Sequence, residues 1–381
     1  MKAIRNIVDK IKPTFSKGGK LGFLHSTFDA FETFLFVPNT TTQHGAHVRD
    51  CNDMKRTMIT VVVALIPALL FGCLNTGYQV GLGLTWTAFF YGLVRILPMI
   101  AVSYIVGLGI EFTVAQWRGH EVNEGFLVSG LLIPLVMPVS TPLWMVALGT
   151  AFAVVFGKEI FGGTGMNVFN PAVLARAFVF FAYTPQMSGE TVWYSTWKMF
   201  GATDATTGAT ALEQLASTGA MQWSALDAFL GFIPGSFGET STLAILIGAA
   251  ILLISGVASW KTMISVFVGG LAMAYTFSLC GVGAMGSQGV EPYMHLLVGG
   301  FAFGAVFMAT DPVTSAQTST GKYIVGFLTG AIAILIREVN PAYPEGMMLS
   351  ILFMNALAPL VDYFVVEANI RRRKNRVKIA K

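Results

Sequence analysis

One short polar segment carries the residues best suited to a covalent modification. It reads Asp204-Ala205-Thr206-Thr207-Gly208-Ala209-Thr210 and matches the pattern D-x-x-(S/T)-G-A-T. Flavin transferases recognise this pattern and attach flavin mononucleotide (FMN) through its phosphate to the final threonine. Small residues such as Gly208 and Ala209 allow a modifying enzyme to approach the backbone. The pattern therefore predicts covalent FMN on Thr210, and the alternative is an ordinary turn rich in serine, threonine and glycine.

A second segment, GGTGMNVFNPA at residues 162–172, combines glycines with two asparagines. Gly163 and Gly165 permit close approach of a ligand to the backbone, and Asn167 and Asn170 stand three residues apart, so both carboxamides can face one ligand. A carboxamide offers a donor and an acceptor together, which suits the edge of a flavin ring. The lysine and strand context of a phosphate-binding loop are missing. A turn capped by an asparagine is an equally good interpretation.

The composition indicates that these segments belong to a membrane protein. Hydrophobic residues make up 54% of the 381 residues and charged residues only 12%, about half the usual charged share. So few charges cannot cover the surface of a soluble fold with this apolar content. The same numbers exclude a disordered chain, a fibrous repeat and a disulfide scaffold. The first 56 residues contain no apolar core followed by a cleavage site, so we predict no cleavable signal peptide.

Basic residues gather at the two ends of the chain. Of the 24 lysines and arginines, nine lie in residues 1–56 and seven in residues 371–381. The positive-inside rule therefore predicts that both termini are cytoplasmic and that the number of membrane spans is even. It also assigns Arg118, Lys158, Lys261 and Lys322 to inside loops. A basic tail that binds nucleic acid is the disfavoured alternative, and no nucleic-acid partner is predicted.

Apolar runs predict an all-α polytopic membrane protein with about ten transmembrane helices. The runs are 57–75, 88–112, 124–140, 143–158, 171–185, 241–258, 262–280, 294–310, 323–338 and 346–366. Prolines at 134, 138, 312 and 359 predict that some helices are broken or re-entrant. The predicted divisions are a basic arm (1–56), five spans (57–185), an acidic external loop (186–240), five spans (241–366) and a basic tail (367–381). Faint similarity between the segments that begin at Glu124 and Glu345 allows two related five-helix halves.

Ionisable residues within apolar segments are costly in a membrane and are therefore functional candidates. Asp311 follows the apolar run 295–310 and precedes Pro312, while Asp362 lies between apolar neighbours. A carboxylate at a broken helix can bind a cation, and a helix-capping aspartate is the alternative for Asp311. The five histidines show no ligand spacing and the three cysteines form no CxxC pair, so no metal site or disulfide framework is predicted. Further candidates are Glu111, Glu159 and Glu338 near span ends, and Arg95 and Arg176 at greater depth.

Several longer stretches closely resemble one protein family. They are HVRD (47–50), HEVNEGF (120–126), GKEIFGGTG (157–165), PGSFGE (234–239), MATDP (308–312) and NPAYPEGMM (340–348). Together with the segment that ends at Thr210, they make almost the whole chain similar to the B subunits of sodium-translocating NADH:quinone oxidoreductases. The resemblance implies covalent FMN on Thr210, non-covalent riboflavin at Asn167 and Asn170, and electron transfer to ubiquinone or menaquinone coupled to sodium export.

The resemblance also implies further site residues and partners. The quinone region of the family matches Gly107-Leu108-Gly109-Ile110-Glu111, where Leu108 replaces the second glycine of a Gly-Gly pair. Acidic residues linked to sodium uptake match Asp311 and Asp362. The sequence has no nicotinamide-binding fingerprint or iron-ligand cluster, so other subunits of the complex must oxidise NADH. A flavin transferase is expected during maturation, and the bacterial inner membrane is the expected location.

Two alternative functions remain at this point. The RnfD subunit of the Rnf-type ferredoxin:NAD oxidoreductase shares the flavin-attachment pattern and the fold, although the basic N-terminal arm and the HEVNEGF stretch favour the quinone-reducing enzyme. A small-solute channel without flavin is compatible with broken helices, but it leaves the pattern at Thr210 unexplained.

Overall fold

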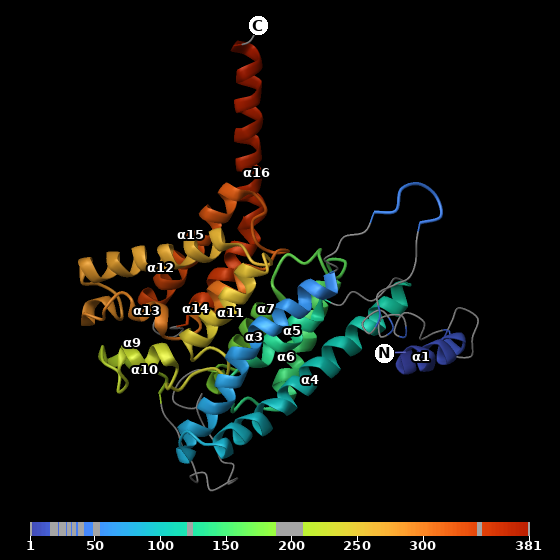
Figure 1. Ribbon diagram of the computed structural model, residues 1–381. Coiled ribbons are helices and arrows are strands. Elements are labelled where there is room, and N and C mark those ends of the chain that lie inside the picture. The colour runs from blue at the N-terminus through green and yellow to red at the C-terminus, as the bar shows by residue number, and fades with distance from the viewer. Residues whose placement is uncertain are drawn as a thin grey trace.

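The computed structural model describes residues 2–15, 22, 28, 32, 36, 42–48, 54–119, 125–187, 209–340 and 345–379. Within these ranges every regular element is a helix (Figure 1). The first part of the chain forms α1 (Lys2–Phe15), α3 (Met54–Gly77), η2 (Tyr78–Leu82), α4 (Trp86–Arg118), α5 (Phe126–Leu135), α6 (Leu143–Val154), η3 (Val155–Glu159), α7 (Pro171–Ala182) and α8 (Thr184–Met187). The second forms α9 (Ala211–Thr218), α10 (Ala225–Leu230), α11 (Thr242–Ile254), α12 (Trp260–Cys280), η4 (Gly286–Gln288), α13 (Met294–Leu297), α14 (Phe301–Phe303), η5 (Gly304–Met308), α15 (Ser319–Val339) and α16 (Met347–Ile379).

Five helical segments of the described chain are long and apolar enough to cross a membrane: Met54–Leu82, Trp86–Arg118, Trp260–Cys280, Ser319–Val339 and Met347–Arg376. Phe126–Leu135, Pro171–Ala182 and Thr242–Ile254 form shorter apolar helices. The prediction of an all-helical fold with several membrane-spanning helices is therefore confirmed. Each of the ten predicted apolar runs contains helix, but a count of ten spans and a division into two related halves stay predictions.

Some predicted spans are broken, and one predicted break is absent. In the run 294–310, the chain divides into α13, α14 and η5, with Gly299 between α13 and α14 in the left-handed region at φ 71°. In the run 124–140, α5 ends one residue after Pro134. By contrast, α16 continues through Pro359, so the predicted interruption there is wrong. A proline removes only one backbone donor, and the remaining hydrogen bonds keep a long helix intact.

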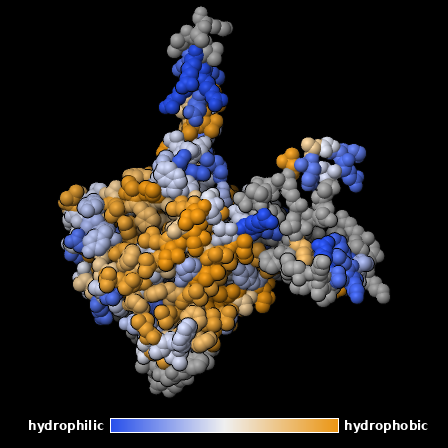
Figure 2. Space-filling view, in the orientation of Figure 1, coloured by the Kyte–Doolittle hydropathy of each residue, from blue (hydrophilic) through white to orange (hydrophobic). Residues whose placement is uncertain are grey.

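The face of the helical body seen in Figure 2 is largely apolar. Large side chains such as Ile105 and Leu279 are 72% and 85% exposed on α4 and α12. A soluble monomer does not expose apolar area on this scale, so this surface faces lipid or other subunits. The polar colouring in Figure 2 is strong on α1, at the start of α3 and on the end of α16 that projects beyond the body.

Glycines bring α12 and α15 into close parallel contact. A side chain at Gly330 would overlap the carbonyl oxygen of Val266, and one at Gly269 would overlap that of Phe327. Small residues at such positions allow membrane helices to approach closely. Because Trp260 also contacts Tyr323, with ring centroids 6.2 Å apart, the two helices begin at the same end of the pair.

Candidate functional site

A pocket at the start of α7 unites several of the predicted residues. It encloses about 100 Å³ and is bordered mainly by apolar side chains of α3, α5, α11 and η5. Its polar lining comes from α3, α5, Lys158 of η3, the loop between η3 and α7 and the chain after η5. The polar residues are Thr57, Ser129, Lys158, Thr164, Asn167, Asn170, Thr310 and Asp311. An apolar pocket with a few converging polar groups is the usual form of a cofactor site.

Three glycines of the glycine-rich loop adopt backbone conformations that favour glycine. Gly162, Gly163 and Gly165 have φ values of 118°, 99° and 90°, which side chains rarely tolerate. A side chain at Gly125, at the start of α5, would overlap Thr164. The glycines therefore fold the loop tightly and let it pack against α5, which directs Thr164 and Asn167 to the pocket wall.

Asn170 caps α7, as the alternative interpretation of this loop required. Its Oδ1 accepts hydrogen bonds from the backbone amides of Ala172 and Val173, at 3.0 and 3.3 Å. Its Nδ2 donates to Oδ2 of Asp311 at 3.0 Å. The structure thus joins two residues that the sequence placed in separate predicted sites. Both ends of the Asn170 carboxamide are already used, which makes it a weaker candidate for contacting a flavin than Asn167.

Asn167 retains binding capacity. It is 8% exposed, and its Nδ2 donates to the carbonyl oxygen of Phe169 at 3.1 Å. Its side-chain oxygen makes no hydrogen bond with the described part of the chain. The buried Oγ1 of Thr164 likewise has no partner there. Because the carbonyl and N–H groups at the edge of a flavin ring need partners of this kind, these two residues fit a flavin ring.

The predicted quinone region lies behind one wall of this pocket. Glu111 of α4 forms a buried ion pair with Lys158, and each side chain is 4% exposed. Lys158 lines the pocket, whereas Gly107, Leu108 and Glu111 do not. A side chain at Gly107 would overlap the ring of Phe126, so this glycine allows α4 to pack on α5. Leu108 packs against the hydrophobic core.

Asp311 and Asp362 each close a turn of the backbone. Asp311 accepts hydrogen bonds from the Val313 amide at 3.0 Å and the Thr314 hydroxyl at 3.1 Å. Asp362 of α16 accepts from the amides of Gln317 and Thr318, at 2.6 and 3.1 Å, and so holds the turn that leads into α15, whose N-cap is Thr318. Asp362 lines a second cavity of about 250 Å³, whose wall includes Asn167. Asn167 therefore lies between the pocket of Asp311 and the cavity of Asp362.

Thr210 is the N-cap of α9. Its φ and ψ are −62° and 156°, and its Oγ1 accepts a hydrogen bond from the amide of Glu213 at 3.3 Å. Thr210 and its neighbour Ala209 are half-buried. The other predicted pattern residues, Asp204, Thr207 and Gly208, lie outside the described residues. The helix N-terminus places partial positive charge beside the Thr210 hydroxyl, which favours a phosphate bound there.

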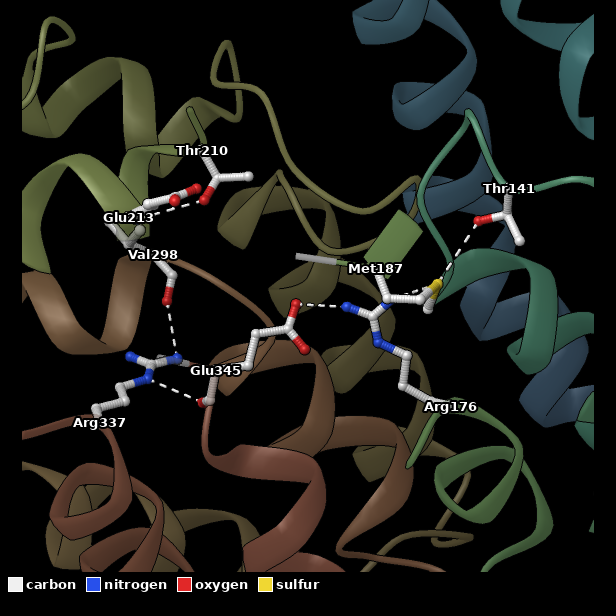
Figure 3. Close-up of polar contacts among 8 residues, drawn as sticks. All are labelled: Thr141, Arg176, Met187, Thr210, Glu213, Val298, Arg337 and Glu345. Atoms are coloured by element: carbon white, nitrogen blue, oxygen red, sulfur yellow. Dashed lines mark hydrogen bonds and ion pairs between the residues drawn. The ribbon is translucent and has the colours of Figure 1, made fainter. Parts of the chain in front are cut away.

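A group of buried charges lies near α9. It consists of the buried Arg176, Glu239 and Arg337 and the half-buried Glu345, and we call it the buried charged group. Nη2 of Arg176 donates to Oε1 of Glu345 at 2.7 Å, while Arg337 donates to the backbone carbonyls of Glu345 and Val298 at 3.0 and 3.1 Å (Figure 3). A side chain at Gly299 would come within 3.0 Å of both Leu212 of α9 and Arg337. Arg337 therefore supports the turn against which α9 packs.

Sequence reasoning found only part of this group. Arg176 was a candidate because it lies within an apolar segment, whereas Arg337, Glu239 and Glu345 received no role. Arg337 carries the same sequence signal, because it also lies within an apolar run, 323–338. In the structure its side chain is 0% exposed. Glu239 and Glu345 lie outside the predicted spans, so only the fold shows that they join the group: Glu345 pairs with Arg176, and Glu239 is buried within electrostatic reach of Glu345 and both arginines.

Comparison with known proteins decides the family. The model described as "NQR2, RnfD, RnfE family" matches residues 41–371. The chain belongs to this family. The resemblance predicted from the sequence is therefore confirmed.

Individual members of the family are similar over nearly their full length. The B subunit of the Na(+)-translocating NADH-quinone reductase of Chromohalobacter salexigens is 48% identical over 403 residues, covering 98% of this chain and 96% of the relative. The proteins of the same name from Stutzerimonas stutzeri and Azotobacter vinelandii are 47% and 46% identical, each covering 97% of this chain and 98% of the relative.

Proposed function

We propose that this protein is the membrane subunit of a sodium-translocating NADH:quinone oxidoreductase that carries FMN covalently on Thr210 and binds riboflavin beside Asn167. Electrons pass from partner subunits to ubiquinone or menaquinone as sodium leaves the cell. The near-full-length similarity to curated B subunits supports this assignment. The single observation that carries the flavin assignment is the position of Thr210, which ends the flavin-transferase pattern and caps α9.

The attachment site would use the local structure of α9. The half-buried hydroxyl of Thr210 is the phosphate acceptor, and the N-terminus of α9 stabilises the negative charge of the phosphodiester. Phosphate oxygens can accept hydrogen bonds from the first amides of the helix in place of the 3.3 Å contact from Glu213. Arg337 holds the turn beneath α9 and so fixes the direction of the attached group.

The riboflavin site would use the pocket at the start of α7. Asn167 and Thr164 provide the free polar groups, and the apolar side chains of the pocket exclude water. Asn170 positions the loop through its cap on α7 and its contact with Asp311. When bound, the two flavins supply the sites that take up and release electrons.

The sodium and quinone assignments rest on the residues around this pocket. Asp311 and Asp362 lie on either side of Asn167, so a change of charge in the pocket acts on both carboxylates. Lys158 connects the pocket to Glu111 in the proposed quinone region. Sodium affinity that depends on the charge of the pocket would couple electron transfer to transport.

We further propose ten spans in the bacterial inner membrane, with both termini cytoplasmic. The distribution of basic residues supports this orientation. The start of α3 and the projecting end of α16 lie on the same side of the helical body (Figure 1), as two cytoplasmic termini require.

Flavin fluorescence in a denaturing gel tests the attachment site. The chain is produced together with its flavin transferase, as wild type, T210N and T218A. Asparagine caps a helix as well as threonine does but has no hydroxyl to esterify, so T210N removes the acceptor and keeps α9. Thr218, at the other end of α9, is the control. Wild type and T218A should show a fluorescent band that T210N lacks, and a fluorescent T210N band would overturn the assignment.

The Rnf-type protein is the second candidate, because the matching family model includes RnfD. A quinone-reduction assay on the purified complex separates the two. Reduction of quinone by NADH supports the proposed function, whereas dependence on ferredoxin without quinone reduction supports the Rnf type.

A further inference from the structure

The parallel contact of α12 with α15 places two helix N-termini side by side. Lys261, in the first turn of α12, donates through Nζ to Oγ of Ser319 at the start of α15, at 2.9 Å. The glycine contacts described above fix this register. Each helix has 21 residues, so the dipole of each places a partial positive charge at this end. Two such ends repel each other unless negative charge lies between them.

Further positive charge lies at the same place. Lys261 and Lys322 both line a cavity of about 210 Å³ that opens between the starts of the two helices, and both are half-buried. In the described part of the chain, neither lysine forms an ion pair with a carboxylate. The sequence placed both lysines in inside loops, and the fold brings them to one cavity.

Only one of the two helix ends has a protein anion. Asp362 accepts hydrogen bonds from the amides of Gln317 and Thr318 and so neutralises the start of α15. At the start of α12, the N-cap residue Ser259 makes no capping hydrogen bond with its side chain. Thr262, one turn further, lines the same cavity and is 1% exposed, and its Oγ1 has no partner among the described residues. A buried hydroxyl without a protein partner is costly, and because Thr262 lines the cavity its hydroxyl is available to a ligand bound there.

We propose that this cavity, the α12–α15 cavity, binds the phosphate of an anionic phospholipid headgroup. The lysines supply charge, and the free amides at the start of α12 and the Thr262 hydroxyl supply hydrogen bonds. Trp260 and Tyr323 lie beside it with 51% and 41% of their surfaces exposed, as aromatic residues do at the membrane–water interface. Basic pockets between helices on the cytoplasmic side suit such headgroups. The proposal holds whether or not Thr210 carries a flavin.

Lipid retention by the purified whole complex tests the proposal. Wild type, T262V, K261Q/K322Q and the control R372Q/K374Q are washed in detergent, and bound phospholipids are quantified by mass spectrometry. The control removes two exposed charges from the projecting end of α16. T262V removes no hydrogen bond within the described protein, so it reports on the ligand even if the double lysine variant fails to assemble.

Wild type and R372Q/K374Q should retain phosphatidylglycerol or cardiolipin, and K261Q/K322Q should retain roughly tenfold less. T262V should fall between them. Equal retention by wild type and T262V, or an equal loss in R372Q/K374Q, would overturn the site.

Thermal stability identifies the source of the phosphate. Delipidated wild type is heated with phosphatidylglycerol micelles, phosphatidylcholine micelles or inorganic phosphate. The proposal predicts stabilisation by phosphatidylglycerol alone, and none in K261Q/K322Q. Stabilisation of wild type by inorganic phosphate alone would support an anion site and overturn the lipid as its ligand. Equal stabilisation by both lipids would overturn the proposal.

Discussion

Arg176 of α7 and Glu345, which precedes α16, form an ion pair across 169 residues of sequence, with Nη2 of Arg176 2.7 Å from Oε1 of Glu345. Arg176 is 1% exposed. The pair joins α7 to Glu345. Arg337 in turn binds the backbone carbonyl of Glu345 and that of Val298, in the turn against which α9 packs. The pocket at the start of α7 and the turn beneath α9 are therefore connected through the buried charged group.

Breaking this ion pair should destabilise the fold. R176M removes the ion-pair partner of Glu345 and leaves Arg337 as the remaining buried cation of the group, and we expect the free energy of unfolding to fall by about 3–5 kcal/mol. R371Q breaks the exposed pair of Arg371 with Glu367 and should cost at most about 1 kcal/mol. Thermal unfolding of the purified complex measures both. If R176M destabilises no more than R371Q, the pair does not hold these segments together.

The stability of the complex should depend on the charge of Glu239. Burial, followed by the nearby charge of Glu345, raises the pKa of Glu239 to about 8. The folded protein then holds a proton that the unfolded chain releases above its usual pKa of 4.5. This contribution to stability is complete below the unfolded pKa and is lost as the pH rises through about 8. The melting temperature of wild type should therefore fall between about pH 5 and pH 8 more steeply than that of E239Q. Parallel curves for the two proteins would contradict a buried, protonated Glu239.

Asn167 and Asn170 should differ in their effect on non-covalent flavin. N167A removes a free pocket group and should lower the riboflavin released by denaturation at least about tenfold, without changing the covalent flavin. N170S keeps the cap on α7 and removes only the contact with Asp311, so most riboflavin should remain. Chromatography of the released flavin measures both variants. A larger loss in N170S than in N167A would reverse the roles assigned here.

Neutralising either aspartate should weaken sodium activation more than flavin content. D311N and D362N keep the size of the side chain and remove its negative charge, so the sodium concentration for half-maximal turnover should rise about tenfold or more. E291Q, on the loop before α13, serves as a control. Sodium titration of quinone reduction is the measurement. Unchanged sodium activation in both aspartate variants would remove them from the coupling route.

Local patterns predicted much of the fold. Long apolar runs can satisfy their backbone in a membrane only as helices, which is why the ten predicted runs all contain helix. Asn170 caps α7, as one of its two interpretations indicated, and the glycines before it have positive φ values that suit their residue type.

Contacts between distant segments could not be predicted. Asn170 and Asp311 are 141 residues apart, and nothing in either segment identifies the other as its partner. The same holds for the buried charged group and for the parallel pairing of α12 with α15. Such relationships depend on how the helices pack, and one sequence contains no separate signal for each contact.

Sodium transport by the reconstituted complex tests the central claim most directly. The complex is placed in lipid vesicles with quinone, NADH is added outside, and sodium uptake is followed for wild type, T218A and T210N. Wild type and T218A should accumulate sodium as NADH is oxidised, while T210N should assemble but neither reduce quinone nor take up sodium. Transport by T210N at the wild-type rate would contradict the assignment of Thr210 as the carrier of an essential flavin.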